Sequence, residues 1–168
     1  KEETQGMEEL KRHFITSDRE YREGEVFVYE QKFTVKDVKK AVFTATALGV
    51  YEAEINGVKI GKQMFAPGYS YYPRRVLYQT YEVSALLREG ANTLRVYLGQ
   101  GWYCGRFLCE NKTQIYGEKP AVSWILRLRM QLVSGTLYPV SRRTNWNLPM
   151  DMQGSMTVRF ILRMEEAQ

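Results

Sequence analysis

Residues 50–60 read Val-Tyr-Glu-Ala-Glu-Ile-Asn-Gly-Val-Lys-Ile, and this stretch decides the fold class. Apolar residues alternate with Glu52 and Glu54, and this period of two is typical of a strand that is wetted on one face. The pair Asn56-Gly57 follows, and it is the strongest short signal for a β-hairpin because both residues accept a positive φ. Val58 then begins the return strand, so the stretch predicts an antiparallel hairpin.

The same period of two continues on both sides of the hairpin. Further strand candidates are 26–29, 40–48, 76–83, 94–98, 123–132, 137–142 and 156–164. Turn signals separate them at about the 8–12-residue spacing of a β-sandwich. Helical signals are minor and include one turn at 84–89, which Gly90 ends. We therefore predict an all-β fold, an antiparallel jelly-roll-like β-sandwich with one or two short helical turns.

Length and composition limit the class of protein. The 168 residues, 44% of them hydrophobic, fit one folded domain. We assign residues 24–168 to a single β-sandwich domain and residues 1–23 to an N-terminal extension. No apolar run approaches the roughly 18–20 residues of a membrane-spanning helix, so we expect no membrane partner. The absence of a start that resembles a signal peptide slightly favours the cytoplasm but does not fix the compartment.

Reactive side chains are few. His13 is the only histidine, which argues against a Ser-His-Asp or Cys-His enzyme and against a multi-histidine metal site. Cys104 and Cys109 do not form a zinc pattern, and we favour free, packed thiols over the alternative of a disulfide. No cluster of Asp and Asn supplies the ~6–8 oxygen ligands that calcium takes. We therefore predict no metal and no cofactor.

The net charge of +5 comes from 24 Lys and Arg against 19 Asp and Glu, and it raises the possibility of a polyanionic partner. In the last third of the chain, Arg127, Arg129, Arg159 and Arg163 alternate with apolar residues in strand-like runs. This pattern favours a solvated sheet face, with domain docking and polyanion binding as alternatives. A basic β domain that binds nucleic acid is our third hypothesis. It lacks an aromatic and basic stacking strand, so we expect no nucleic-acid partner.

Three groups of motifs stand in order along the chain. They are Gly49-Val50-Tyr51-Glu52 with Ile55-Asn56-Gly57, Ala66-Pro67-Gly68-Tyr69 with Tyr72 and Arg75, and Gly99-Gln100-Gly101-Trp102-Tyr103 with Gly105-Arg106. This ordered set resembles the N-terminal β-sandwich domain of bacterial α-L-rhamnosidases, closely over residues 24–107 and more loosely through 126–146. The resemblance implies a sandwich that precedes a separate (α/α)-barrel catalytic domain, which hydrolyses terminal L-rhamnose with inversion. It also implies that this chain is a fragment of a longer multidomain enzyme and is not an enzyme alone.

The carboxylates do not predict catalysis. An inverting glycosidase needs two carboxyl groups roughly 6.5–9.5 Å apart, one of them with a raised pKa. Glu52 and Glu54 share one side of a predicted strand, but nothing in the sequence surrounds either with an apolar wall. We interpret both as solvated surface and name no catalytic residue.

The loops at 66–75 and 99–107 carry the residue types that bind sugars. Aromatic rings stack on the apolar face of a pyranose, and arginines bind its hydroxyl groups. The candidates for contact with a sugar or with another domain are Tyr69, Tyr71, Tyr72, Arg74, Trp102, Tyr103 and Arg106. For Trp102 we favour core or domain packing over sugar contact, because the flanking glycines allow its indole to close one end of the sandwich.

The leading functional hypothesis is a non-catalytic accessory domain of an α-L-rhamnosidase that braces the catalytic barrel. Its partner is then the catalytic domain of the same parent chain, and the isolated fragment is expected to expose an apolar patch and to self-associate. The alternative is a carbohydrate-binding module that itself binds L-rhamnose-containing glycans.

Overall fold

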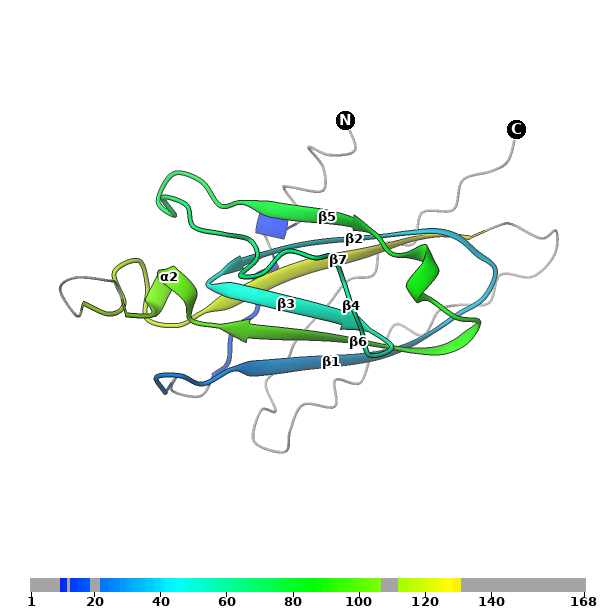
Figure 1. The fold of residues 1–168 in the computed structure, drawn as a ribbon, viewed down its shortest axis with the longest axis horizontal. Coiled ribbons are helices and arrows are strands. Elements are labelled where there is room, and N and C mark those ends of the chain that lie inside the picture. Colours follow the sequence, from blue (N-terminus) through cyan, green and yellow to red (C-terminus); the bar gives the residue numbers. More distant parts are fainter. Residues whose placement is uncertain (1–9, 12, 19–21, 107–111, 131–168) are drawn as a thin grey trace.

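The computed structural model describes residues 10–11, 13–18, 22–106 and 112–130 (Figure 1). Its strands are β1 (Phe27–Val35), β2 (Val38–Leu48), β3 (Val50–Ile55), β4 (Val58–Lys59), β5 (Tyr78–Glu82), β6 (Gly90–Gly99) and β7 (Ala121–Met130). The two named helical turns are the 3₁₀ turn η1 (Ser84–Leu86) and the helix α2 (Gly101–Cys104). The prediction of an all-β sandwich with one or two short helical turns is confirmed.

The strands form two antiparallel sheets. One sheet has the order β1-β6-β3-β4 and the other has the order β5-β2-β7. In the second sheet, β2 pairs with β7 from Val38 opposite Met130 to Leu48 opposite Ala121. The chain passes from one sheet to the other at Gly49, whose φ is +138°. A Cβ atom there would lie 2.4 Å from the carbonyl oxygen of Gly99, so only glycine fits this crossing.

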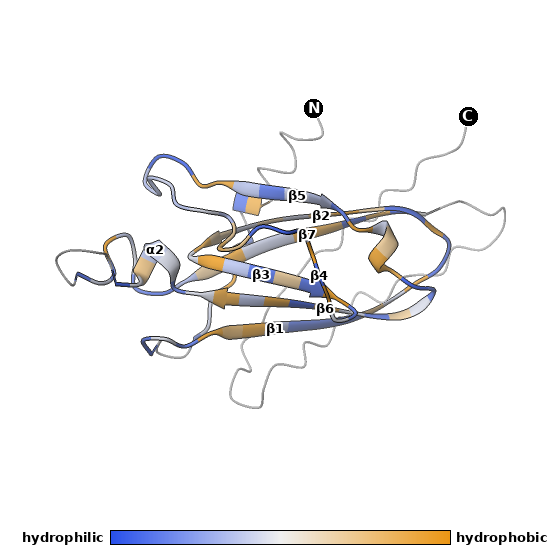
Figure 2. Cartoon of the chain, in the orientation of Figure 1, coloured by the Kyte–Doolittle hydropathy of each residue, from blue (hydrophilic) through white to orange (hydrophobic). Residues whose placement is uncertain are grey.

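The core lies between the two sheets and follows the period of two. On β6, Leu94, Val96 and Leu98 are buried, while the residues between them are half-buried. The rings of Tyr29 on β1 and Trp124 on β7 lie 5.9 Å apart, so the inner faces of the two sheets meet there. Figure 2 shows hydrophobic positions along the strands and a hydrophilic connection between β1 and β2.

The hairpin has the predicted turn. Asn56 and Gly57 have φ angles of +54° and +80°, and Ile55 pairs with Val58 across the turn. The return strand β4 is shorter than the sequence pattern suggests. Gly61 has a φ of +73° and redirects the chain soon after β4 ends.

The other predicted strands agree with β1, β2, β5, β6 and β7, with shifted ends. The strands predicted at 137–142 and 156–164 lie outside the described residues. Part of the segment assigned to the N-terminal extension packs on the sandwich: Leu10 and Ile15 are buried, and Ile15 exchanges backbone hydrogen bonds of 2.8 and 2.9 Å with Val122. No helix in the described part of the chain is long and apolar enough to cross a membrane.

Candidate functional site

The aromatic loop between β4 and β5 is fixed to the end of the sandwich. The backbone N–H of Tyr51 on β3 donates a 2.6 Å hydrogen bond to the carbonyl of Ala66. The side-chain amide of Gln79 on β5 donates a 2.9 Å bond to the carbonyl of Pro67, and it accepts a 3.0 Å bond from the Tyr51 hydroxyl. Burial raises the pKa of Tyr51 above its usual range, so this hydroxyl stays protonated and remains a donor.

The helix α2 brings the second aromatic loop to the same end of the molecule (Figure 1). It begins at Gly101, where φ is +51° and a Cβ atom would lie 2.7 Å from Cγ1 of Val50. Cys104 ends the helix as a free, buried thiol, and burial raises its pKa to about 11. Of the two alternatives for the cysteines, Cys104 therefore has the free thiol that we favoured. Cys109 lies outside the described residues.

Seven aromatic side chains gather where these loops meet. We call Phe65, Tyr69, Tyr71, Tyr72, Trp102, Tyr103 and Tyr116 the aromatic cluster. Tyr72 is buried at its centre, with its ring centroid 5.1 Å from both Tyr103 and Tyr116 and 6.4 Å from Tyr69. The contacts with Tyr69 and Tyr103 are edge-to-face, the geometry that the quadrupoles of aromatic rings favour.

The rim of the aromatic cluster is exposed. Phe65 and Tyr69 approach the Trp102 ring at centroid distances of 6.4 and 6.2 Å. The Tyr69 and Tyr116 hydroxyls lie 3.2 Å apart in a hydrogen bond. Yet Phe65, Tyr69 and Tyr71 keep 60%, 48% and 53% of their surface exposed. The cluster is therefore a packed base that presents apolar edges to the outside.

The hydroxyls of Tyr72, Tyr103 and Tyr116 are not bases near neutral pH. Burial, and to a lesser degree the neighbouring tyrosines, raise the pKa of Tyr72 to about 12. Burial also raises the pKa of Tyr103, and the hydrogen bond between the Tyr116 and Tyr69 hydroxyls raises that of Tyr116. The cluster thus offers ring surfaces, and the protonated hydroxyls of these three tyrosines suit packing and hydrogen bonding and do not suit proton abstraction.

The structure brings together five of the seven candidate residues: Tyr69, Tyr71, Tyr72, Trp102 and Tyr103. The two arginines have other contacts in the described part of the structure. Arg106 forms two hydrogen bonds of 3.0 Å to the carboxylate of Glu23, and Arg74 lines a neighbouring hollow.

The sequence analysis missed two members of the aromatic cluster. Phe65 stands just before the loop, and Tyr116 lies in a segment that the sequence marks as polar. Gly117 follows Tyr116, and a Cβ atom at Gly117 would lie 2.5 Å from the Tyr103 hydroxyl. Glycine there allows the close approach of the Tyr103 ring.

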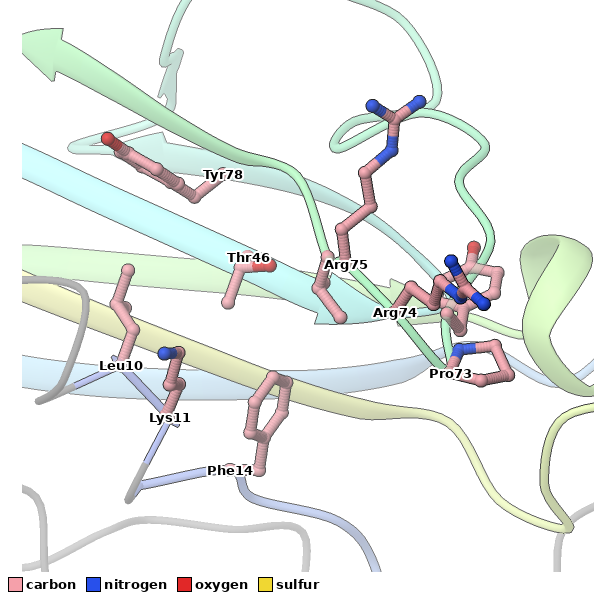
Figure 3. A pocket seen from close by; sticks show the side chains of 10 residues that line it. Leu10, Lys11, Phe14, Thr46, Pro73, Arg74, Arg75 and Tyr78 are labelled. Atoms are coloured by element: carbon pink, nitrogen blue, oxygen red, sulfur yellow. The ribbon is translucent and has the colours of Figure 1, made fainter.

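A hollow of about 220 Å³ lies beside the aromatic cluster (Figure 3). One wall is the N-terminal segment with Leu10, Lys11 and Phe14, and the other is the chain that leads into β5. Thr46 of β2 lies between the two walls, and Tyr72 contributes to both the hollow and the aromatic cluster. The two features therefore share one buried ring.

The carboxylates lie on the outside of the sandwich and are engaged in ion pairs. Glu52 accepts a 2.7 Å bond from Lys59, while Arg95 binds Glu30 and Glu54 at 2.6 and 3.1 Å. This agrees with the interpretation of Glu52 and Glu54 as surface residues. Within the described ranges, no group of three or more His, Cys, Asp or Glu side chains could hold a metal ion.

Comparison with known proteins assigns this domain to a protein family. The sequence profile of the α-L-rhamnosidase N-terminal domain family matches residues 36–162. The chain belongs to this family. An α-L-rhamnosidase of Streptomyces avermitilis is 39% identical over 118 residues, which cover 70% of this chain and 11% of that protein. The resemblance that the loop motifs carry is thereby confirmed.

Solved structures agree with this family assignment of the domain. The crystal structure of an α-L-rhamnosidase from Aspergillus terreus matches with a TM-score of 0.66 and 35% identity, over 70% of this chain and 14% of that one. The Streptomyces avermitilis α-L-rhamnosidase in complex with L-rhamnose matches with a TM-score of 0.58 and 40% identity, over 61% of this chain and 10% of that one. The chain spans 8% to 12% of the curated relatives that it matches.

Proposed function

We propose that this domain is a non-catalytic accessory part of an α-L-rhamnosidase, a glycosidase that acts on terminal L-rhamnose, and that it braces the catalytic part of the same parent chain. Its family membership and the small share of the relatives that it spans support this role. The division into an extension of residues 1–23 and a sandwich of residues 24–168 belongs to the same proposal. The raised pKa of Tyr72 at the centre of the aromatic cluster also favours a role in contact over a role in chemistry.

The distribution of exposed apolar side chains is the observation that carries the bracing role. Nine large apolar residues are exposed in the described part of the chain, and six of them lie between residues 64 and 78. We call these six the apolar patch: Met64, Phe65, Tyr69, Tyr71, Leu77 and Tyr78. An apolar surface gathered on one connection is typical of a contact with another domain or protein. Phe65, Tyr69 and Tyr71 also belong to the aromatic cluster, whose ring contacts hold this connection in place.

The bracing role can be tested by comparing the 168-residue chain with the longer protein that the full reading frame of the gene encodes. We expect that the 168-residue chain releases no 4-nitrophenol from 4-nitrophenyl α-L-rhamnopyranoside, whereas the longer protein does. Phe65→Ser and Tyr71→Ser should lower the melting temperature of the longer protein by several degrees. In the isolated chain the same variants should lower the melting temperature much less, because both side chains are already more than half exposed there and lose only their ring contacts.

Val58→Ser is the matched control, since Val58 is 52% exposed and lies at the hairpin, outside the apolar patch. It should have little effect in either protein. If Phe65→Ser and Tyr71→Ser lowered the melting temperature equally in the longer and the isolated protein, the bracing role would be contradicted. Sedimentation of the isolated chain provides a second test, because an uncovered apolar patch is expected to cause self-association that Phe65→Ser reduces.

Sugar binding by the aromatic cluster is the second candidate function. The half-exposed rings of Tyr69 and Tyr71 favour it, because they stand on a packed base and lose little side-chain freedom on contact with a pyranose. Calorimetric titration with L-rhamnose tests it. Heat that Tyr71→Ala abolishes would support binding. The absence of heat at millimolar sugar would leave bracing as the role of the cluster.

A further inference from the structure

We propose that the hollow beside the aromatic cluster binds one sugar unit that carries a carboxylate, that is, a uronic acid residue of a glycan. The choice of a sugar rests on the proposed function in a glycosidase. The preference for a negative charge rests on the hollow alone. The hollow contains none of the exposed tyrosines of the cluster rim, so this site is distinct from the second candidate function above.

Among the described residues that line the hollow, the charged side chains have one sign. They are Lys11, Arg74 and Arg75, and none of the described lining residues is a carboxylate. In the part of the chain that the structure describes, the guanidinium groups of Arg74 and Arg75 have no hydrogen-bond or ion-pair partner. Both side chains extend from the wall that leads into β5 (Figure 3). The two guanidinium groups point in different directions in Figure 3, and each by itself provides planar donors that match a carboxylate.

The rest of the lining suits the body of a sugar ring. Phe14 and Tyr78 provide aromatic surface, on which the apolar face of a pyranose packs. Thr46 is buried between the walls, and its hydroxyl already donates a 2.6 Å hydrogen bond to the carbonyl of Leu77. The volume of about 220 Å³ is below the ~300–1,000 Å³ of sites for larger ligands. The hollow therefore fits a single unit and does not fit an oligosaccharide.

Both walls are held in place before any ligand arrives. The N-terminal wall is fixed by the pairing of Ile15 with Val122, and the Thr16 hydroxyl donates a 2.8 Å bond to the carbonyl of Pro120. In the other wall, the backbone N–H groups of Arg74 and Arg75 donate to the carbonyl of Tyr71 at 2.9 and 3.1 Å. A site that is formed in advance loses less entropy when it binds a ligand.

A pair of matched probes tests this site on the 168-residue chain. We expect methyl β-D-glucuronide to shift the amide resonances of Thr46 and residues 73–78 saturably in a two-dimensional NMR titration. Methyl β-D-glucoside, which differs only in having a hydroxymethyl group in place of the carboxylate, should bind at least about tenfold more weakly. Arg74→Gln and Arg75→Gln should each weaken glucuronide binding about tenfold, and the double variant should abolish it.

Arg88→Gln is the charge-matched control. Arg88 is exposed near η1, at the other end of the sandwich, so its loss should leave glucuronide binding unchanged (Figure 1). Well-dispersed spectra of all variants show that they fold. Equal binding of the two probes, no saturable shift, or unchanged binding in the double variant would overturn the site. Tighter binding of methyl glucoside 6-sulfate would overturn the assignment to a carboxylate. The bracing role is unaffected by these outcomes because its test uses the longer protein.

Discussion

The side-chain nitrogen of Asn56 lies 2.8 Å from the side-chain oxygen of Asn92, and this bond joins the β3–β4 hairpin to the start of β6. The same Asn56 nitrogen donates to the carbonyl of Leu86 at 2.9 Å, and its oxygen accepts from the N–H of Thr93 at 3.0 Å. One turn residue thus connects the hairpin, η1 and β6. The sequence identifies Asn56 as a turn residue, and the structure adds this second role.

Replacement of Asn56 separates these two roles. Asn56→Gly keeps a residue that adopts the φ of +54° but removes three hydrogen bonds. We expect it to lower the free energy of unfolding by about 1–3 kcal/mol. Asn56→Ala should cost about 1 kcal/mol more, because alanine is strained at positive φ. Urea unfolding monitored by circular dichroism measures both changes. If Asn56→Gly had the same urea midpoint as the wild-type protein, the three hydrogen bonds of Asn56 would add no stability.

The sheet crossing at Gly49 predicts a strong effect of a single methyl group. In Gly49→Ala the new Cβ would lie 2.4 Å from the carbonyl oxygen of Gly99, which is backbone and cannot move freely. We expect a loss of several kcal/mol or a failure to fold. Gly24→Ala is the matched control, because Gly24 also has a positive φ, +80°, but faces open space. It should cost only about 1 kcal/mol. Similar thermal midpoints for the two variants would contradict this account.

Because the hydroxyl of Tyr72 is buried, we predict that its removal does not destabilise the fold. This oxygen has no hydrogen-bond partner among the described residues. Tyr72→Phe keeps the ring contacts and removes an unsatisfied polar atom, so the free energy of unfolding should stay the same or rise by up to about 1 kcal/mol. Tyr69→Phe is the comparison, since it removes the 3.2 Å bond to Tyr116 and should not stabilise. Thermal unfolding measures both, and a clear loss in Tyr72→Phe would reveal a partner.

Alkaline pH should destabilise the fold. Burial raises the pKa of Cys104 from 9.0 to about 11 and that of Tyr29 from 10.0 to about 12. The unfolded chain therefore releases these protons at a lower pH than the folded chain does. The contribution of these two groups to the free energy of unfolding should be fully present below about pH 9 and should decrease as the pH rises from 9 to 12. Urea midpoints across this range measure the decline. Cys104→Ala should make it shallower below pH 11, and an unchanged slope would contradict the assignment.

Local signals in the sequence predicted most of the sandwich. The alternation on β6 and the Asn56-Gly57 turn depend on neighbours within a few residues, so the pattern is sufficient to predict them. The candidate site was harder to predict from the sequence because its contacts join segments that are distant along the chain. Arg106 pairs with Glu23 across 83 positions, and Tyr116 meets Tyr69 across 47. Nothing in the local sequence around Arg106 or Tyr116 indicates such a partner.

The glycine crossing between β2 and β3 has a consequence for how the molecule opens. Leu48 belongs to one sheet and Val50 to the other, so neither sheet can detach without pulling on a strand of its neighbour. Amide hydrogens in the centres of both sheets should therefore exchange with solvent in a single cooperative event of common free energy. Both sheets together would accordingly resist a mechanical load applied through the accessory domain, until the whole sandwich unfolds.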